Sequence, residues 1–208
     1  SLNHVVWSFR GFNDKVLLTQ GRTKRPIEGT RMRTSLSHPI QIAELPIQDG
    51  VLGLTFCPGK RSSSLNGQPW ARDLETDLKA IKAWGANLVI TLMEQQEFQL
   101  LAVPDLSERV AANGMAWLHL PIRDVDIPTA EFLANWPVQC SGLLDRLAGG
   151  EKILLHCRGG LGRTGLVAAM LLIDTGVLPD PAITLVRKVR PGAIETKAQE
   201  AFVRGYHP

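Results

Sequence analysis

The chain has 208 residues, of which 44% are apolar and 21% charged, and its formal net charge at pH 7 is +3. This composition is typical of a soluble globular protein, and so small a net charge gives no support for a nucleic-acid partner. No stretch reaches the roughly 18 consecutive apolar residues of a membrane-spanning helix. The three cysteines, Cys57, Cys140 and Cys157, form no C-x-x-C pair. This argues against a disulfide framework or zinc site and favours the reducing cytoplasm.

Residues 1–37 differ from the rest of the chain. Gly11, Gly21 and Gly29 interrupt them, basic residues dominate positions 22–33, and no apolar period persists. The segment is predicted to be a basic N-terminal extension, either a disordered arm or an addition to the natural start, with Met32 as an internal start. A single domain is predicted over residues 38–208, because this length suits one core.

From Pro39 onward, strand and helix patterns alternate. Predicted strands have alternating or β-branched apolar residues, and predicted helices have apolar residues three and four apart. We first expect strands at 40–45 and 51–56 with a hairpin at Asp49-Gly50, a loop at 57–69, and a helix at 71–84 ended by Gly85. There follow a strand at 87–93, short helices at 94–103 and 104–113, a strand at 116–122, and a helix from Pro128 to about Leu147. The last part has a strand at 152–156, a helix from about 163, a helix with Asp180 as N-cap and Pro181 at N1, and a helix from about Thr196.

This alternation predicts a three-layer α/β fold, in which a mostly parallel central sheet has helices on both faces. In such folds, ligands bind beyond the carboxyl ends of the strands. The sequence His-Cys-Arg-Gly-Gly-Leu-Gly-Arg-Thr-Gly at residues 156–165 follows the last predicted strand and precedes an apolar helix. A glycine-rich loop of this kind directs backbone N–H groups inward, and the following helix adds a positive field. The sequence therefore predicts an anion site that contains a thiol.

Each residue type in this segment suits chemistry on a phosphate ester. A thiolate at Cys157 is the nucleophile, because a helix N-terminus and a nearby arginine lower a thiol's pKa. Arg163 can bind two phosphoryl oxygens through its guanidinium. The Thr164 hydroxyl can donate to the Cys157 sulfur, and His156 is expected to fix the loop geometry. The predicted phosphate-binding residues are Arg158, Gly159, Gly160, Leu161, Gly162 and Arg163, with the glycines allowing positive φ and a close approach of the backbone.

The leaving group also requires an acid. Asp124 and Asp126 are the candidates, because both follow the predicted 116–122 strand and should lie at the same sheet edge as Cys157. Gln199 stands three residues after Thr196, which is the spacing of a capping box, and we favour this interpretation.

The Cys-x5-Arg-Thr motif resembles that of the cysteine-based protein phosphatases, the tyrosine and dual-specificity superfamily. Three segments are similar to the cyclin-dependent-kinase-associated phosphatase group: residues 156–164, Pro121-Ile122-x-Asp124 with Pro128, and Gly192-Ala193-Ile194-x-Thr196. The resemblance covers about residues 38–206. It implies the protein tyrosine phosphatase fold, Asp124 as general acid, and a supporting role for Gln199 in orienting water.

The resemblance implies a phosphomonoesterase that needs no metal or cofactor and forms a phosphocysteine intermediate. The expected substrates are phosphoproteins, with phosphotyrosine first and phosphoserine or phosphothreonine second, and a protein kinase is a further candidate partner. One alternative is an inositol phosphate or phosphoinositide phosphatase, although residues 158–162 contain no lysine for extra phosphates. The other is a pseudophosphatase that binds phosphoproteins without hydrolysing them.

Overall fold

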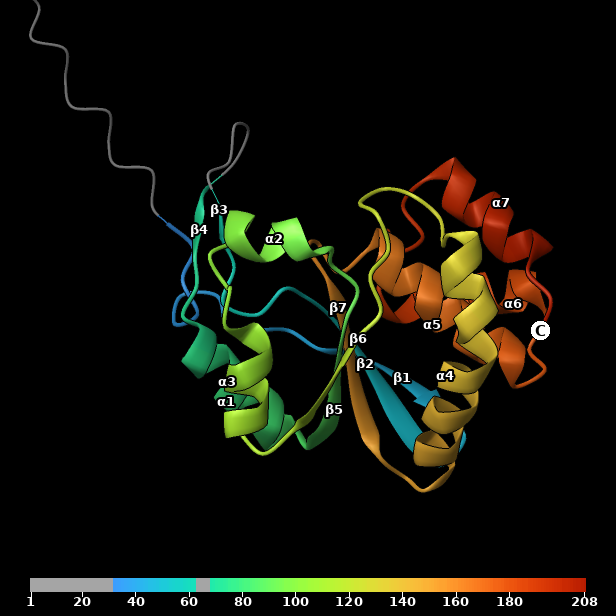
Figure 1. Cartoon of the computed structure of the whole chain (residues 1–208), viewed down its shortest axis with the longest axis horizontal. Helices are drawn as coiled ribbons and strands as arrows, with labels where there is room; N and C mark the ends of the chain where they lie inside the picture. The colour runs from blue at the N-terminus through green and yellow to red at the C-terminus, as the bar shows by residue number, and fades with distance from the viewer. Residues whose placement is uncertain (1–31, 63–67) are drawn as a thin grey trace, which may run out of the picture. The chain divides into compact units, whose positions relative to one another are not determined.

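A five-stranded sheet forms the centre of the protein in this computed structural model, which describes residues 32–62 and 68–208 (Figure 1). β1 pairs antiparallel with β2, and the other neighbouring strands are parallel. In spatial order the strands are β1 (Ala43–Ile47), β2 (Gly50–Phe56), β7 (Lys152–Cys157), β5 (Ala86–Thr91) and β6 (Ala116–His119). The predicted mostly parallel sheet is confirmed.

Helices cover both faces of this sheet, as the three-layer prediction requires. One face packs against α1 (Leu74–Trp84), α2 (Gln95–Leu100) and α3 (Leu106–Ala112). The other packs against α4 (Ala130–Ala148), α5 (Gly162–Asp174), α6 (Pro179–Val189) and α7 (Lys197–Gly205) (Figure 1). Within the described residues, no helix combines the length and apolar character needed to cross a bilayer.

The central strand β7 shows why its sequence is continuously apolar. Ile153 and Leu155 belong to the core under α4–α7, whereas Leu154 between them belongs to the core under α1–α3. Successive side chains of a strand point to opposite faces, and both faces are buried here. Placing β7 at the centre of the sheet also places the segment that follows it at the centre of one sheet edge.

The predicted hairpin between the first two strands is present, but it turns at Gln48 and Asp49 and not at Asp49 and Gly50, with Gln48 at φ 53°. α1 begins after Asp73 and not at residue 71, because the Asp73 side chain accepts a hydrogen bond from the Thr76 amide. The predicted end of this helix is confirmed. Gly85 ends this helix at φ 103°, a left-handed conformation that glycine adopts without steric cost.

Boundaries elsewhere in the chain also differ from the prediction. α6 begins at Pro179, one residue before the predicted cap at Asp180, because extended Leu178 precedes a proline whose φ is already helical. α4 begins after Thr129, whose hydroxyl accepts from the Phe132 amide, and not at Pro128. β6 ends at His119, although the chain still bonds to the β5 side through the amide of Ile122 and the Leu92 carbonyl.

Residues 32–37 pack against the domain, although the sequence placed them in the extension. The Arg33 amide donates to the Pro69 carbonyl at 2.9 Å, and the Ser35 hydroxyl donates to the Asp73 carbonyl and accepts from the Asp73 amide. The predicted 57–69 loop contains β3 (Arg61–Ser62), which pairs with β4 (Trp70–Ala71). The division of the chain at residue 38 stays a prediction, and residues 1–31 lie outside the described part.

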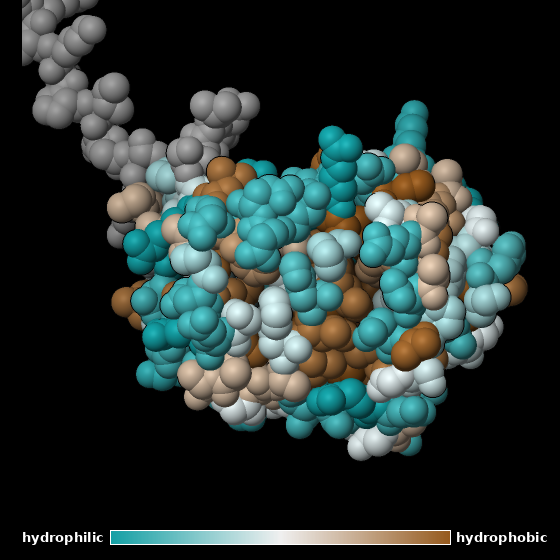
Figure 2. Space-filling view, viewed as in Figure 1, coloured by the Kyte–Doolittle hydropathy of each residue, from teal (hydrophilic) through white to brown (hydrophobic). Residues whose placement is uncertain are grey.

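Hydrophilic and apolar surfaces are separated on the face shown in Figure 2. Apolar residues gather in its central hollow, whereas the upper edge is mostly hydrophilic (Figure 2). This upper edge is where β7 ends and α2 lies (Figure 1). The carboxyl ends of the parallel strands, where the predicted anion site falls, therefore meet at a polar edge.

Candidate active site

The segment after β7 forms a tight loop around the Cys157 sulfur. Cys157 is the last residue of β7, and α5 begins at Gly162. The amide of Gly160 donates to the Cys157 sulfur at 3.1 Å. The described residues offer no acceptor to the amides of Gly159 and Leu161. The 157–163 loop thus combines a buried thiol with unpaired N–H donors, which suits an anion.

The glycines of this loop have different roles. Gly160 has φ 71°, and a Cβ there would lie 2.4 Å from the Thr55 backbone. Gly162 has no positive φ, but a Cβ there would lie 2.9 Å from the side-chain oxygen of Gln199. Gly159 has neither constraint, because a Cβ there meets no atom within 4 Å. The prediction that all three glycines allow positive φ is wrong for Gly159 and Gly162.

Arg163 is buried in the first turn of α5, with 1% of its surface exposed. It bonds to both oxygens of Glu97, at 2.6 and 2.9 Å, and to Asp124 Oδ1 at 2.7 Å. Burial opposes its charge, but its hydrogen bonds to Glu97 and the charges of Cys157, Glu97 and Asp124 raise its pKa. Its Nε is buried without a partner in the described residues. This free N–H can accommodate an additional oxygen acceptor.

Glu97 is a site residue that the sequence analysis missed. It lies in α2, just beyond the carboxyl end of β5, and is almost fully buried. Burial raises its pKa, but hydrogen bonds from Arg163 and from the Glu94 amide outweigh this effect, and the net shift is downward. Glu94-x-x-Glu97 is itself a capping box. Because the helix cap explains this carboxylate locally, only its position at the same sheet edge indicated a second role.

Asp124, and not Asp126, reaches the loop with its side chain. Asp124 is 43% exposed and lies between two guanidinium groups, Arg163 at 2.7 Å and Arg158 at 3.7 Å. The Asp126 carboxylate instead accepts from the amide of the next residue at 2.9 Å. Val125 between them has φ 56°, a left-handed conformation that turns the chain. The structure therefore brings one of the two predicted acids to the site.

His156 holds the end of β7 from inside the core. Its Nε2 lies 2.8 Å from the Thr91 hydroxyl, which in turn accepts from the Trp117 indole at 2.9 Å. The other ring nitrogen, Nδ1, lies 3.4 Å from the Cys157 carbonyl, which can only accept, so Nδ1 carries the proton and Nε2 accepts from Thr91. Burial lowers the pKa of His156 to about 4, so that its ring is neutral near pH 7. This agrees with a role in fixing geometry.

Thr164 is also fully buried. Its hydroxyl has no hydrogen-bond partner within the described residues. The predicted bond to the Cys157 sulfur is therefore absent from this structure, and the hydroxyl stays available as a donor beside the loop.

Residues 70–203 match the family model described as "PTP-SAK: Swiss Army Knife protein, DSP-PTPase phosphatase domain". Cyclin-dependent kinase inhibitor 3 from Mus musculus is 30% identical over 174 residues, covering 81% of this chain and 79% of the relative. The Rattus norvegicus protein of the same name is 31% identical over 175 residues, with the same coverage. The chain belongs to the DSP-PTPase family of phosphatases.

A solved structure supports the same assignment for this phosphatase. Kinase associated phosphatase, with its catalytic-site cysteine replaced by serine, aligns with a TM-score of 0.71 and 29% identity. The alignment covers 79% of this chain and 92% of that chain. The predicted fold and the resemblance to the kinase-associated group are confirmed, and the chain is an enzyme of the tyrosine/dual-specificity phosphatase class.

Gln199 joins the end of the phosphatase chain to the site. Its side-chain oxygen accepts from the Thr196 and Glu195 amides at 3.3 and 3.1 Å, which confirms the capping box. Its amide nitrogen donates to the Asp126 carbonyl at 3.0 Å. Its side chain also packs against Gly162. Gln199 thus caps α7 and contacts both the Asp124 segment (residues 124–126) and the 157–163 loop.

Two further cations contact the loop from outside, and neither was predicted. Lys60 Nζ donates to the Arg158 carbonyl at 3.3 Å, and Arg190 Nε donates to the Gly160 carbonyl at 3.0 Å. Carbonyls that point outward leave the neighbouring N–H groups pointing inward. Lys60 follows the end of β2 by four residues, and β2 is the neighbour of β7. This position was the sequence signal that could have placed Lys60 near the loop.

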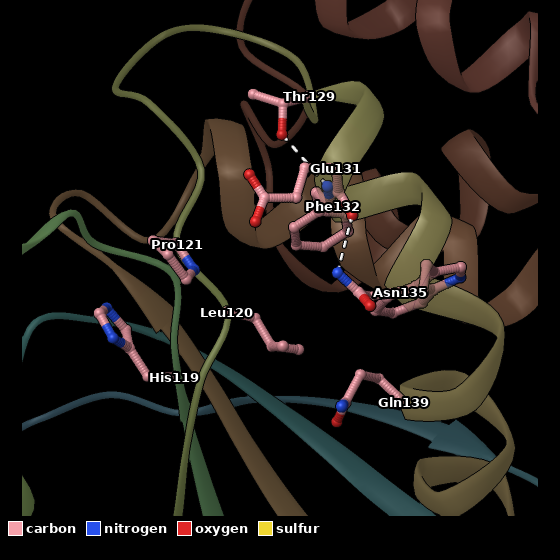
Figure 3. Close-up of a pocket in the computed structure, with 9 residues that line it drawn as sticks. His119, Leu120, Pro121, Thr129, Glu131, Phe132, Asn135 and Gln139 are labelled. Atoms are coloured by element: carbon pink, nitrogen blue, oxygen red, sulfur yellow. Dashed lines mark hydrogen bonds between the residues drawn. The ribbon is translucent and has the colours of Figure 1, made fainter.

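A cavity of about 330 Å³ lies between the end of β6 and the start of α4 (Figure 3). His119 and Pro121 lie on one side of it, and Phe132, Asn135 and Gln139 lie on the other (Figure 3). Neither the 157–163 loop nor residues 122–128 line it. The cavity therefore lies outside the group of residues around Cys157.

Proposed function

We propose that this phosphatase hydrolyses phosphate monoesters on proteins, with phosphotyrosine as the first substrate class and phosphoserine and phosphothreonine as the second. The observation that carries the proposal is the environment of the Cys157 sulfur. This sulfur accepts a hydrogen bond from the Gly160 amide, inside a loop that ends at the buried, charged Arg163. Kinase associated phosphatase also has a catalytic-site cysteine, which supports Cys157 as its counterpart.

The reaction proceeds in two displacements. The Cys157 thiolate attacks phosphorus, the bond to the ester oxygen breaks, and Asp124 donates a proton to that oxygen. Water then attacks the phosphocysteine, Asp124 accepts its proton, and inorganic phosphate leaves with the thiolate restored. No metal takes part in either step. The Thr164 hydroxyl donates to the departing sulfur.

Arg163 binds the phosphoryl oxygens through both steps. Its Nε is unpaired, and one terminal nitrogen is held by the exposed Asp124 carboxylate. A phosphate dianion competes for these donors, while the two bonds to buried Glu97 keep the guanidinium in place. Substrate binding thus releases the Asp124 carboxyl from Arg163, so that it can reach the leaving oxygen.

Two further proposals concern the partner and the location of this chain. The relatives are named as inhibitors or associates of kinases, and we propose a protein kinase as a partner of this chain. All three cysteines are free thiols, which agrees with a cytoplasmic location.

The first test is hydrolysis of p-nitrophenyl phosphate by the purified protein, with and without EDTA. Turnover should be abolished by Cys157→Ser and unaffected by EDTA. Cys140→Ser is the matched control, because Cys140 lies in α4 and bonds to Asp174, away from the loop. Turnover that survives Cys157→Ser would exclude the mechanism. Phosphate binding without turnover would identify a pseudophosphatase.

The second test separates the substrate classes. Release of phosphate is measured from phosphotyrosine peptides, phosphoserine/threonine peptides, inositol phosphates and phosphoinositides under one set of conditions. We expect the highest kcat/KM for phosphotyrosine peptides. A higher value for any inositol-based substrate would replace the proposal with the alternative of an inositol phosphate or phosphoinositide phosphatase.

A further inference from the structure

Lys60 is a buried lysine beside the 157–163 loop. Only 9% of its surface is exposed. Its Nζ lies 4.5 Å from the centre of the Phe56 ring and 5.1 Å from that of Trp70, and it donates to the Arg158 carbonyl at 3.3 Å. Arg158 directly follows Cys157 in the chain. The ammonium group is therefore fixed next to the backbone that carries the sulfur.

Among residues 32–62 and 68–208, no carboxylate balances this charge. Of the lysines in the described part of the chain, Lys79 alone has a carboxylate oxygen within 4.0 Å. The buried carboxylate of Asp77 is already bonded to Arg72 at 2.7 Å through each of its oxygens. A buried cation without a counter-ion costs free energy, and the two aromatic rings offset only part of that cost. An anion inside the adjacent loop is the counter-charge that this arrangement lacks.

We propose that Lys60 is a positioning residue for Cys157, whose thiolate its charge stabilises from outside the loop. This role rests on the proposed function of Cys157 as nucleophile. The ammonium acts through the field at the sulfur and contacts neither substrate nor leaving group. Its hydrogen bond also keeps the Arg158 carbonyl directed away from the anion.

The charged and titratable groups around Lys60 and Cys157 are compatible with stabilisation of the thiolate by the lysine. Burial lowers the pKa of Lys60 to about 8, opposed by Cys57 and Cys157 and assisted by Arg72 and Arg33, so that the lysine is charged near neutral pH. Burial raises the pKa of Cys57, which therefore stays a neutral thiol. The remaining groups facing the sulfur are the neutral ring of His156, the cations Arg163 and Arg190, and the anions Glu97 and Asp124, both bonded to Arg163.

The test is the pH dependence of Cys157 alkylation by iodoacetamide, followed by mass spectrometry of the peptide that contains Cys157. Lys60→Met and Lys60→Gln should each raise the midpoint by roughly one pH unit. Alkylation below the midpoint should slow about tenfold, because only the thiolate reacts. Lys60→Arg should keep the wild-type midpoint.

Lys152→Met is the matched control. Lys152 donates to the Trp84 carbonyl at 3.1 Å and lies 4.9 Å from the Trp84 ring centre, but it stands at the opposite end of β7. Its loss should leave the Cys157 midpoint unchanged.

An unchanged midpoint in Lys60→Gln overturns the proposal, whatever Lys60→Met shows, because glutamine keeps a donor for the Arg158 carbonyl and removes only the charge. Lys60→Gln also decides the question if Lys60→Met does not fold. Alkylation requires no turnover, so a failure of the proposed hydrolase function would be seen separately, in the p-nitrophenyl phosphate assay.

Discussion

Replacing Lys60 by methionine should make the protein more stable at pH 7. Burial lowers the pKa of Lys60 from 10.5 to about 8. At about 1.4 kcal/mol per pH unit, keeping this lysine charged in the folded state costs roughly 3 kcal/mol. Methionine removes that cost and loses the hydrogen bond to Arg158, worth about 1 kcal/mol. The free energy of unfolding should therefore rise by about 2 kcal/mol.

The gain should disappear as the pH rises. Below about pH 8 the lysine is protonated in both the folded and unfolded states, and the full cost applies. Between about 8 and 10.5 the unfolded state binds the proton more strongly, so wild-type stability rises with pH. The difference between Lys60→Met and wild type should thus fall by roughly 3 kcal/mol over this interval.

Urea denaturation at several pH values between 7 and 10.5, followed by circular dichroism, measures this difference directly. Titrations common to both proteins cancel when the variant is compared with wild type. Lys152→Met is again the control and should lower stability, because it removes a hydrogen bond and a ring contact from a less buried lysine. A difference that stays constant with pH, or wild type being the more stable protein at pH 7, would refute the reasoning.

Three other predictions concern the site. Asp124→Asn should lower kcat for a phosphopeptide by about 10²–10⁴-fold, whereas Asp126→Asn should change it only a few fold; the reverse order in steady-state kinetics would reassign the acid. Glu97→Gln should lower the free energy of unfolding by about 3 kcal/mol and reduce kcat/KM, because it breaks the buried ion pair with Arg163. An unchanged midpoint of urea denaturation would contradict this. Gly160→Ala should lower thermal stability and activity, because its Cβ would overlap the β2 backbone. Gly159→Ala should change neither, because a Cβ there lies in open space. Equal effects of the two substitutions on Tm would contradict this packing argument.

The central part of the site was predictable because it is local in sequence. Residues 156–164 supply the thiol, the glycines and the arginine in one stretch, and β7 and α5 on either side have clear apolar patterns. Asp124 was also found, because it follows a recognisable strand whose end meets the same sheet edge. The residues alone left Asp124 and Asp126 open, and the family resemblance favoured Asp124. The positive φ of Val125, which turns the chain between them, is indicated by no residue type in that segment.

The supporting residues were not predictable in the same way. Glu97, Lys60 and Arg190 lie 66, 98 and 30 positions from the loop residues to which they are hydrogen-bonded. Each has an ordinary local explanation as a helix cap, a loop lysine or a residue near a helix end. Their roles depend on which strands are neighbours, and the order β2-β7-β5 is a property of the whole fold.

Gln199 makes the end of the chain part of the working enzyme. Because one amide side chain caps α7, bonds to the Asp126 carbonyl and packs on Gly162, the last helix cannot loosen without freeing the segment that carries the acid. Removing α7 is therefore not a neutral change for this protein. A variant cut before residue 197 would keep Cys157, Arg163 and Asp124 and still lose the side chain that connects the Asp126 carbonyl to Gly162.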